Sequence, residues 1–331
     1  MALVHGGLDR LAMAGDVVRS TMSALTSSAL RSLGEIGQAA RYVARTCGRP
    51  AGVRGLAVEW AWLAAHLAAY PAGLVAEKLA ESGDGYRTDN LRPRRRSLVV
   101  TDVEAAGTPI LLVHGIMDNR SVFAVFRRTL RRRGFGVVHA VNYSLFTGDV
   151  RDAAHQLRSH VERLRGQTGA DKVHIVGHSL GGMIARYYVQ RMGGSAVVDT
   201  LVTLGSPHSG TLAAYLLPTP LARQLRPGSE LIEELTEPAP DCSTRFLVVW
   251  SRMDQMIVPQ RNARLTHPDL DVEQFEMHDV GHLSLPLDPR SVHWVATALA
   301  RSDRGCHPFR RGQARSVASI TTFRDQSSPA S

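Results

Sequence analysis

The sequence predicts an α/β fold, a doubly wound and mainly parallel sheet of about six strands, preceded by an N-terminal helical extension. Two observations support this prediction. Between residues 97 and 300, short apolar runs rich in Val, Ile and Leu alternate with segments of helical spacing. The apolar runs are continuous, which is typical of parallel strands buried on both faces. Right-handed crossovers between such strands place helices on both faces of the sheet.

The expected elements follow from these runs in chain order. Strands are expected over 97–103, 109–115, 136–143, 172–178, 196–206, 244–251 and 271–277. Helices are expected over 121–133, 149–166, a segment that begins after residue 179, and 289–300. We expect one large domain over 97–300 with a cap or lid insertion at about 207–240, and a disordered Arg- and Ser-rich tail over 301–331.

Residues 1–90 form the expected helical extension. Apolar residues recur every three to four positions over 8–45, and 56–80 is apolar but interrupted by Glu59, His66 and Pro71. These interruptions favour a buried or interfacial helix over a membrane-spanning one. The N-terminus shows no secretory signal pattern. We therefore expect a cytoplasmic or peripherally membrane-associated protein, whose extension packs on the domain or contacts a membrane surface.

Composition excludes several classes of function. The formal charge is +9, but nearly all of the positive charge is arginine spread along the chain. The local basic runs over 92–96 and 127–135 are short and carry no interleaved aromatic platform. This indicates compositional bias, and we expect no nucleic-acid partner. Cys47, Cys242 and Cys306 are far apart and odd in number, so they predict neither a metal site nor a disulfide framework. Oligomeric state is left open.

Ser179 lies at a tight corner between an apolar run and an amphipathic segment, in the stretch VHIVGHSLGGMIARYY. The pattern Gly-x-Ser-x-Gly in a strand–turn–helix context is a nucleophile elbow. Its glycines leave room for a strained serine whose hydroxyl projects at the carboxyl end of the sheet. We interpret Ser179 as a catalytic nucleophile.

A serine nucleophile needs a base and an orienting carboxylate, which follow it in the order Asp or Glu, then His. Asp254 comes just after the apolar run 244–251, whereas Asp241 precedes that run and is rejected. His282 lies in the loop after the last expected strand and is preferred to His278, which lies directly at the strand's end. The predicted triad is Ser179, Asp254 and His282.

The oxyanion of the transition state needs hydrogen-bond donors. The backbone N–H of Leu180, the residue after the nucleophile, is one expected donor, and the N–H of Ile116, in the loop after the run 109–115, is the other. His114 and His178, which neighbour these positions, are interpreted as structural residues.

Five motifs in order resemble those of bacterial lipases and esterases of the α/β-hydrolase fold. They are LLVHGIMDN, VHIVGHSLGGMIARYY, LVTLGSPHSGT, WSRMDQMIVP and VGHLSL. The resemblance covers about 97–300 and implies the same triad and oxyanion donors. It also implies that 212–240 forms an apolar cover or acyl-binding wall, although its leucines are equally compatible with core packing. Two departures are the missing signal peptide and the absence of the first two strands ahead of residue 97.

These observations predict a carboxylic ester hydrolase that cleaves acyl esters, with lipid esters as the expected substrates and with no metal or organic cofactor. An acyltransferase or thioesterase with the same triad is the alternative, because the acceptor of the acyl group decides between these activities. A non-catalytic membrane-associated scaffold is disfavoured by the intact Ser, Asp and His. Acyl-chain length and the physiological substrate are not determined by the sequence.

Overall fold

The computed structural model describes residues 107–116, 120–143 and 148–300, the helical residues 34, 37, 41 and 57, and a short strand at 315–316. The chain divides into two compact units, Met1–Arg49 and Pro50–Ser331, and the fold below belongs to the second. The predictions for the N-terminal extension and for a strand over 97–103 lie outside the described residues, apart from the four helical positions.

The sheet is wholly parallel, with strand order β2-β1-β3-β4-β5-β6-β7. Its strands are β1 (Ile110–Val113), β2 (Val138–Val141), β3 (Val173–His178), β4 (Val198–Leu204), β5 (Arg245–Ser251), β6 (Asp271–Met277) and β7 (Arg315–Ser316). After β1 the chain passes to one side for β2 and then to the other side for β3. In such sheets, ligands bind at the carboxyl ends of the strands where this reversal occurs.

The prediction of a parallel α/β sheet is confirmed, with six strands between residues 110 and 277. The seventh strand, β7, comes from the segment predicted to be disordered and is two residues long. It pairs in parallel with β6. The rest of that tail lies outside the described residues, so its disorder stays a prediction.

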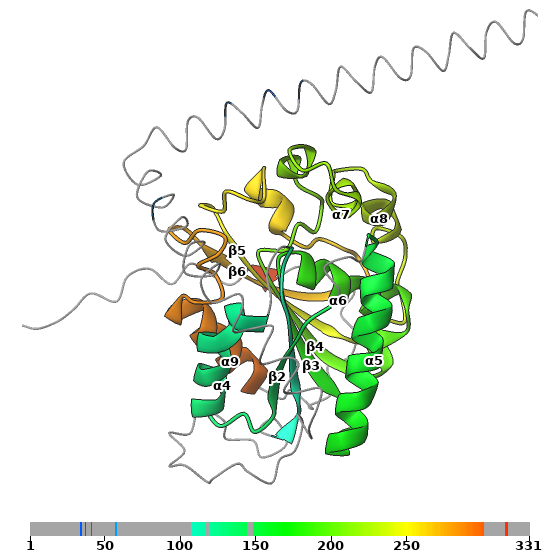
Figure 1. Ribbon diagram of the computed structural model, residues 1–331, viewed down its shortest axis with the longest axis vertical. Coiled ribbons are helices and arrows are strands. Elements are labelled where there is room, and N and C mark those ends of the chain that lie inside the picture. Colours follow the sequence, from blue (N-terminus) through cyan, green and yellow to red (C-terminus); the bar gives the residue numbers. More distant parts are fainter. Residues whose placement is uncertain are drawn as a thin grey trace, which may run out of the picture. The chain divides into compact units, whose positions relative to one another are not determined.

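Helices cover both faces of the sheet (Figure 1). The long helices are α4 (Ala124–Arg132), α5 (Val150–Thr168), α6 (Leu180–Arg191) and α9 (Pro289–Ala300). α5 and α6 pack on one face and α4 and α9 on the other, and each pair belongs to its own buried apolar cluster. Neighbouring residues of a strand point to opposite clusters, as Leu111 and Leu112 do on β1. Burial on both faces explains the continuous apolar runs of the sequence.

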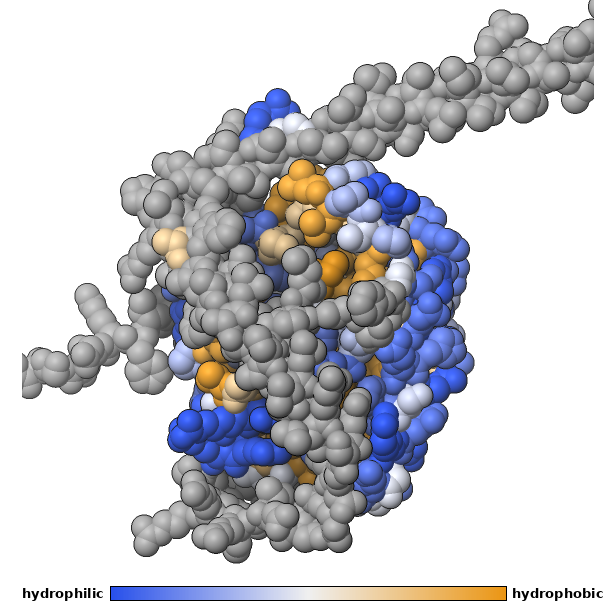
Figure 2. All heavy atoms as spheres, viewed as in Figure 1, coloured by the Kyte–Doolittle hydropathy of each residue, from blue (hydrophilic) through white to orange (hydrophobic). Residues whose placement is uncertain are grey.

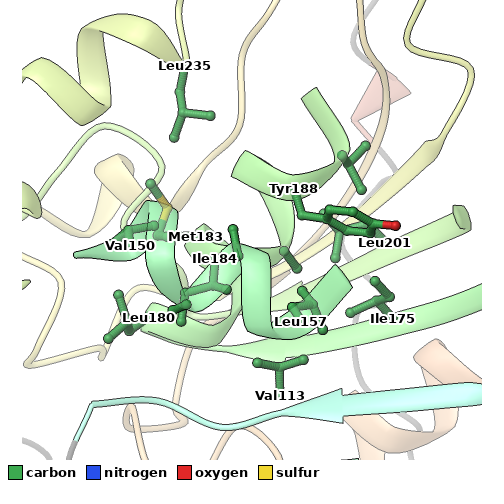
Figure 3. Packing of buried hydrophobic residues seen from close by; sticks show 14 of the residues in the cluster. Val113, Val150, Leu157, Ile175, Leu180, Met183, Ile184, Tyr188, Leu201 and Leu235 are labelled. Atoms are coloured by element: carbon green, nitrogen blue, oxygen red, sulfur yellow. The ribbon is translucent and has the colours of Figure 1, made fainter. Parts of the chain in front are cut away.

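The apolar cluster beneath α5 and α6 holds α6, the helix that follows Ser179, in place (Figure 3). Leu180, Met183 and Ile184 of α6 are fully buried there, beside Val150 and Leu157 of α5. α5 is bounded by clear capping signals: the Asp149 side chain accepts a hydrogen bond from the Arg151 N–H at 2.7 Å, and Gly169 ends the helix with φ 68°. The start of α6 is thus packed against a helix with well-defined ends.

The segment between β4 and β5 carries three short helices, η3 (Leu212–Tyr215), α7 (Pro220–Gln224) and α8 (Glu230–Glu234). Most of its apolar residues belong to the core beneath α5 and α6, namely Leu221, Leu225, Leu231, Ile232 and Leu235. Leu216 differs, because 77% of it is exposed. Figure 2 shows apolar side chains gathered on the surface over this segment. The structure thus assigns most of these leucines to core packing.

His174 on β3 makes the stability of the fold depend on pH. Burial lowers its pKa below the ordinary 6.5, and the nearby Asp199 carboxylate opposes this shift. Asp199 lies 3.5 Å from Nδ1 with its side chain 48% exposed, so it compensates only part of the cost of burying a charge. His208 is also buried, and burial followed by the Arg186 charge lowers its pKa. The unfolded chain therefore binds more protons than the folded one below about pH 6.5.

Because of this difference, the free energy of unfolding should fall as pH drops below about 6.5. His174→Gln should reduce that fall by about 1–2 kcal/mol between pH 7.5 and pH 5, as measured by urea unfolding at each pH. His155→Gln, at an exposed position on α5, is the matched control and should leave the pH dependence unchanged. Equal pH dependence in wild type and His174→Gln would contradict the assignment.

Candidate active site

Ser179 is held in a strained conformation at the corner between β3 and α6. Its φ is 54° and its ψ is −121°, and among the described residues no other non-glycine residue has a positive φ. A non-glycine residue in such a region costs on the order of 1–3 kcal/mol, and this strain is concentrated at functional sites. The elbow predicted from the sequence is therefore present as backbone geometry.

The elbow glycines are required by close backbone approaches. A Cβ added at Gly177 would overlap the backbone of Gly182, and one added at Gly181 would overlap the carbonyl oxygens of Val113 and His114. The second contact has a further consequence: it presses the start of α6 against the end of β1. The elbow and the loop after β1 are thus adjacent, at the reversal point of the sheet.

Asp254 and His282, which are 28 residues apart in the sequence, form a buried pair. His282 Nδ1 lies 2.8 Å from Asp254 Oδ2. The other carboxylate oxygen of Asp254 accepts hydrogen bonds from the Met256 and Ile257 N–H groups, both at 2.9 Å. Since Oδ2 can only accept, Nδ1 carries the proton, and Nε2 is the acceptor in the neutral ring.

Backbone contacts bring this pair to the elbow. The Ser179 N–H donates to the Leu204 carbonyl at 2.9 Å. A Cβ on the next residue, Gly205, would lie 3.1 Å from Asp254 Oδ2 and 3.2 Å from His282 Nδ1. On the other side of the serine, His178 Nε2 lies 3.1 Å from the His282 carbonyl oxygen and donates to it. Ser179, Asp254 and His282 thus gather around the carboxyl end of β4.

The rejected candidates lie away from this cluster. His278 has a side chain that is 54% exposed, and its Nδ1 lies 3.6 Å from Glu276 Oε1. Asp241 is exposed and precedes β5, at the opposite end of that strand from Asp254. The structure therefore places the predicted residues together and the alternatives apart.

The two expected oxyanion donors follow neighbouring strands. Ile116 lies in the turn three residues after the end of β1, and Leu180 is the first residue of α6, directly after β3 and the elbow serine. The first N–H groups of a helix have no partner within it, so the Leu180 N–H is available to an external acceptor. β1 and β3 are hydrogen-bonded neighbours, which brings their following loops to the same edge.

Arg186 is a buried residue of α6 that was not among the predicted site residues. Its guanidinium donates to the carbonyl oxygens of His208 at 3.1 Å and Leu235 at 2.7 Å, and to Gln190 Oε1 at 2.6 Å. Burial lowers the pKa of Arg186 to about 9. It ties α6 to the loop after β4 and to the end of α8. In the sequence, the signal for this structural role is one arginine among the apolar residues of the helical segment after Ser179.

Within the described part of the chain, no group of three or more His, Cys, Asp or Glu side chains is arranged to hold a metal ion. Among the same residues, no helix combines the length and apolarity that crossing a bilayer requires.

Several known proteins are similar to parts of this chain in sequence. The palmitoyl protein thioesterase family matches residues 109–237. Triacylglycerol lipases of Burkholderia plantarii and Pseudarthrobacter phenanthrenivorans are each 31% identical to it, over 122 and 111 residues, which is 34% and 31% of this chain. The matches cover 33% and 34% of those lipases, so the chain spans about a third of their length.

The chain has the α/β-hydrolase fold. Solved structures agree with this fold. The crystal structure of Aspergillus fumigatus lipase B has a TM-score of 0.51 at 19% identity and covers 58% of this chain and 52% of that one. The propeptide form of Bacillus licheniformis lipase BlEst2 has a TM-score of 0.50 at 15% identity, covering 66% and 54%. The expected α/β-hydrolase fold is confirmed.

Proposed function

We propose that this α/β-hydrolase cleaves carboxylic esters through a Ser179–His282–Asp254 triad and an acyl-enzyme. The observation that carries the proposal is the buried Asp254–His282 pair, joined at 2.8 Å, beside a serine held at φ 54°. Acyl transfer needs three groups that fit this arrangement: a nucleophile held under strain, a base in a defined tautomer, and a carboxylate whose other oxygen is bound by backbone N–H groups.

In this mechanism the Ser179 hydroxyl attacks the acyl carbonyl while His282 Nε2 takes its proton. Asp254 holds Nδ1–H and stabilises the imidazolium. The N–H groups of Ile116 and Leu180 bind the tetrahedral oxyanion. His282 then gives the proton to the leaving alcohol, and a water molecule activated by the same ring releases the acid and regenerates the serine.

Lipid acyl esters are the substrate class that we propose. The similar curated proteins are named triacylglycerol lipases. In addition, two large apolar side chains are exposed on neighbouring segments, Leu216 at 77% and Met256 at 41%. A hydrogen bond joins these segments, because the Thr211 hydroxyl donates to the Met256 carbonyl at 2.7 Å. Met256 itself lies two residues after Asp254. An apolar surface close to the triad suits a long acyl chain.

Thioester hydrolysis is a second candidate, supported by the match of residues 109–237 to the palmitoyl protein thioesterase family. Acyl transfer to an alcohol uses the same acyl-enzyme. The three activities differ in the leaving group and in the acceptor, not in the triad. Peripheral membrane association through residues 1–90 stays a prediction, since only four helical positions of that segment belong to the described part of the chain.

One substrate panel separates these activities. We expect p-nitrophenyl esters to be hydrolysed, with faster turnover of long acyl chains and a rate increase when the substrate forms an emulsion. Faster turnover of palmitoyl thioesters than of matched oxygen esters would favour a thioesterase. Formation of a new ester when an alcohol is added would favour an acyltransferase. No turnover of any of these acyl substrates would contradict the proposal.

A further inference from the structure

The carbonyl oxygen of Gly115 is held by two side chains in the loop after β1. The Tyr143 hydroxyl, two residues after the end of β2, donates to it at 3.0 Å. His114 Nδ1 lies 2.9 Å from the same oxygen and donates to it. The two rings stack, with centroids 4.5 Å apart and an interplanar angle of 14°. All of this is buried, with Tyr143 7% and His114 0% exposed.

This carbonyl shares one rigid group with an expected oxyanion donor. The Gly115 C=O and the Ile116 N–H are the two ends of a single planar peptide unit, which is trans. In a trans peptide these two bonds point in opposite directions. Fixing the C=O toward Tyr143 and His114 therefore fixes the direction of the Ile116 N–H. A carbonyl that accepts hydrogen bonds also polarises the N–H of its own peptide unit.

The other end of this loop is already anchored. Gly181 of the elbow packs so closely on the Val113 and His114 carbonyl groups that a Cβ would overlap both oxygens. The backbone is thus held in place as far as His114, and the 115–116 peptide is the first one after it that can rotate. The Tyr143 hydroxyl binds the carbonyl of that peptide.

We propose that Tyr143 is a positioning residue of the oxyanion hole: its hydroxyl holds the Gly115 carbonyl so that the Ile116 N–H faces the oxyanion. This inference rests on the proposed function, because it needs Ser179 to form a tetrahedral adduct. Tyr143 touches no reacting atom. It acts through the 115–116 peptide, and its loss should weaken stabilisation of the tetrahedral state more than binding of the substrate.

A fluorophosphonate probe tests this step without knowledge of the natural substrate. Ser179 Oγ forms a bond to phosphorus, the P–F bond breaks, fluoride leaves, and the serine proton passes to His282. The phosphoryl oxygen carries the developing negative charge and occupies the oxyanion hole. The second-order rate constant of labelling therefore reports how strongly the oxyanion hole stabilises this charge.

Tyr143→Phe keeps the stacked ring and removes only the hydroxyl. We expect labelling and the kcat for a p-nitrophenyl ester to fall about tenfold, less than for complete loss of an oxyanion donor, with KM changed by less than about twofold. Tyr188→Phe is the matched control, a buried tyrosine of α6, 3% exposed, in the same apolar cluster. It should label at the wild-type rate. Thermal unfolding of each variant verifies that both are folded.

Each outcome separates this proposal from the one on which it rests. If the wild-type protein is labelled at Ser179 and Tyr143→Phe is labelled equally fast, the role of Tyr143 is overturned and the proposed function still stands. Equal losses of labelling rate in Tyr143→Phe and Tyr188→Phe would show a general effect of removing a buried hydroxyl, and they would also overturn the role of Tyr143. Wild-type protein that is not labelled at all overturns the proposed function and this inference with it.

Discussion

Ser179→Ala should abolish ester turnover, with a loss of kcat of about a millionfold. The hydroxyl at the elbow is the atom that attacks the acyl carbon, and an alanine offers no nucleophile in its place. Alanine keeps the backbone geometry that the corner requires, at φ 54°, so the fold should be retained. The measurements are initial rates with a p-nitrophenyl ester, together with the thermal unfolding midpoint.

Ser209→Ala is the matched control for this experiment. Ser209 is an exposed serine in the loop after β4, and its backbone N–H and C=O form hydrogen bonds with Asn262. We expect it to retain wild-type activity. Turnover by Ser179→Ala at the wild-type rate would show that another group is the nucleophile, and the triad would have to be abandoned.

His282→Ala should be nearly as severe as loss of the nucleophile. The ring is the only proposed base for the serine proton, and its removal also takes the Nδ1–H donor away from the buried Asp254 carboxylate. A buried charge that loses a partner destabilises the fold as well. We therefore expect kcat to fall about 10⁴-fold or more, with a lower midpoint of urea unfolding.

His278→Ala is the control that decides the assignment of the base. The two histidines are four residues apart, but His278 is 54% exposed beside Glu276, whereas the His282 side chain is 3% exposed. His278→Ala should keep wild-type kcat and stability. If His278→Ala is inactive and His282→Ala is active, the proton passes through the other histidine and the proposed geometry is wrong.

Several elements followed from the sequence because their causes are local. Continuous apolar runs can be recognised without knowledge of their partners, and the strands Val173–His178 and Asp271–Met277 begin and end within one residue of the expected limits. The elbow was recognisable for a similar reason, since the backbone conformation of Ser179 requires glycines at fixed positions beside it. Strand order, by contrast, is a property of pairing and has no local signal.

The surroundings of the proposed triad depended on contacts between distant segments. Gly205 lies against both Asp254 and His282, yet in the sequence it is one glycine in a turn. The leucines of the segment between β4 and β5 were equally compatible with an acyl-binding wall and with core packing. Most of them pack under α5 and α6, while Leu216 is exposed, because the fold decides which side of each short helix meets the core.

The sequence by itself determined the fold class, the corner at Ser179 and the chain order in which Asp254 and His282 follow it, since each depends on residue types at short spacing. Only the tertiary structure decided that Asp254 Oδ2 meets His282 Nδ1 at 2.8 Å, and that Tyr143 and His114 converge on the Gly115 carbonyl. These contacts join loops that follow different strands. Their positions are set by how the parallel sheet brings its carboxyl ends to one edge, which no single stretch of the chain specifies.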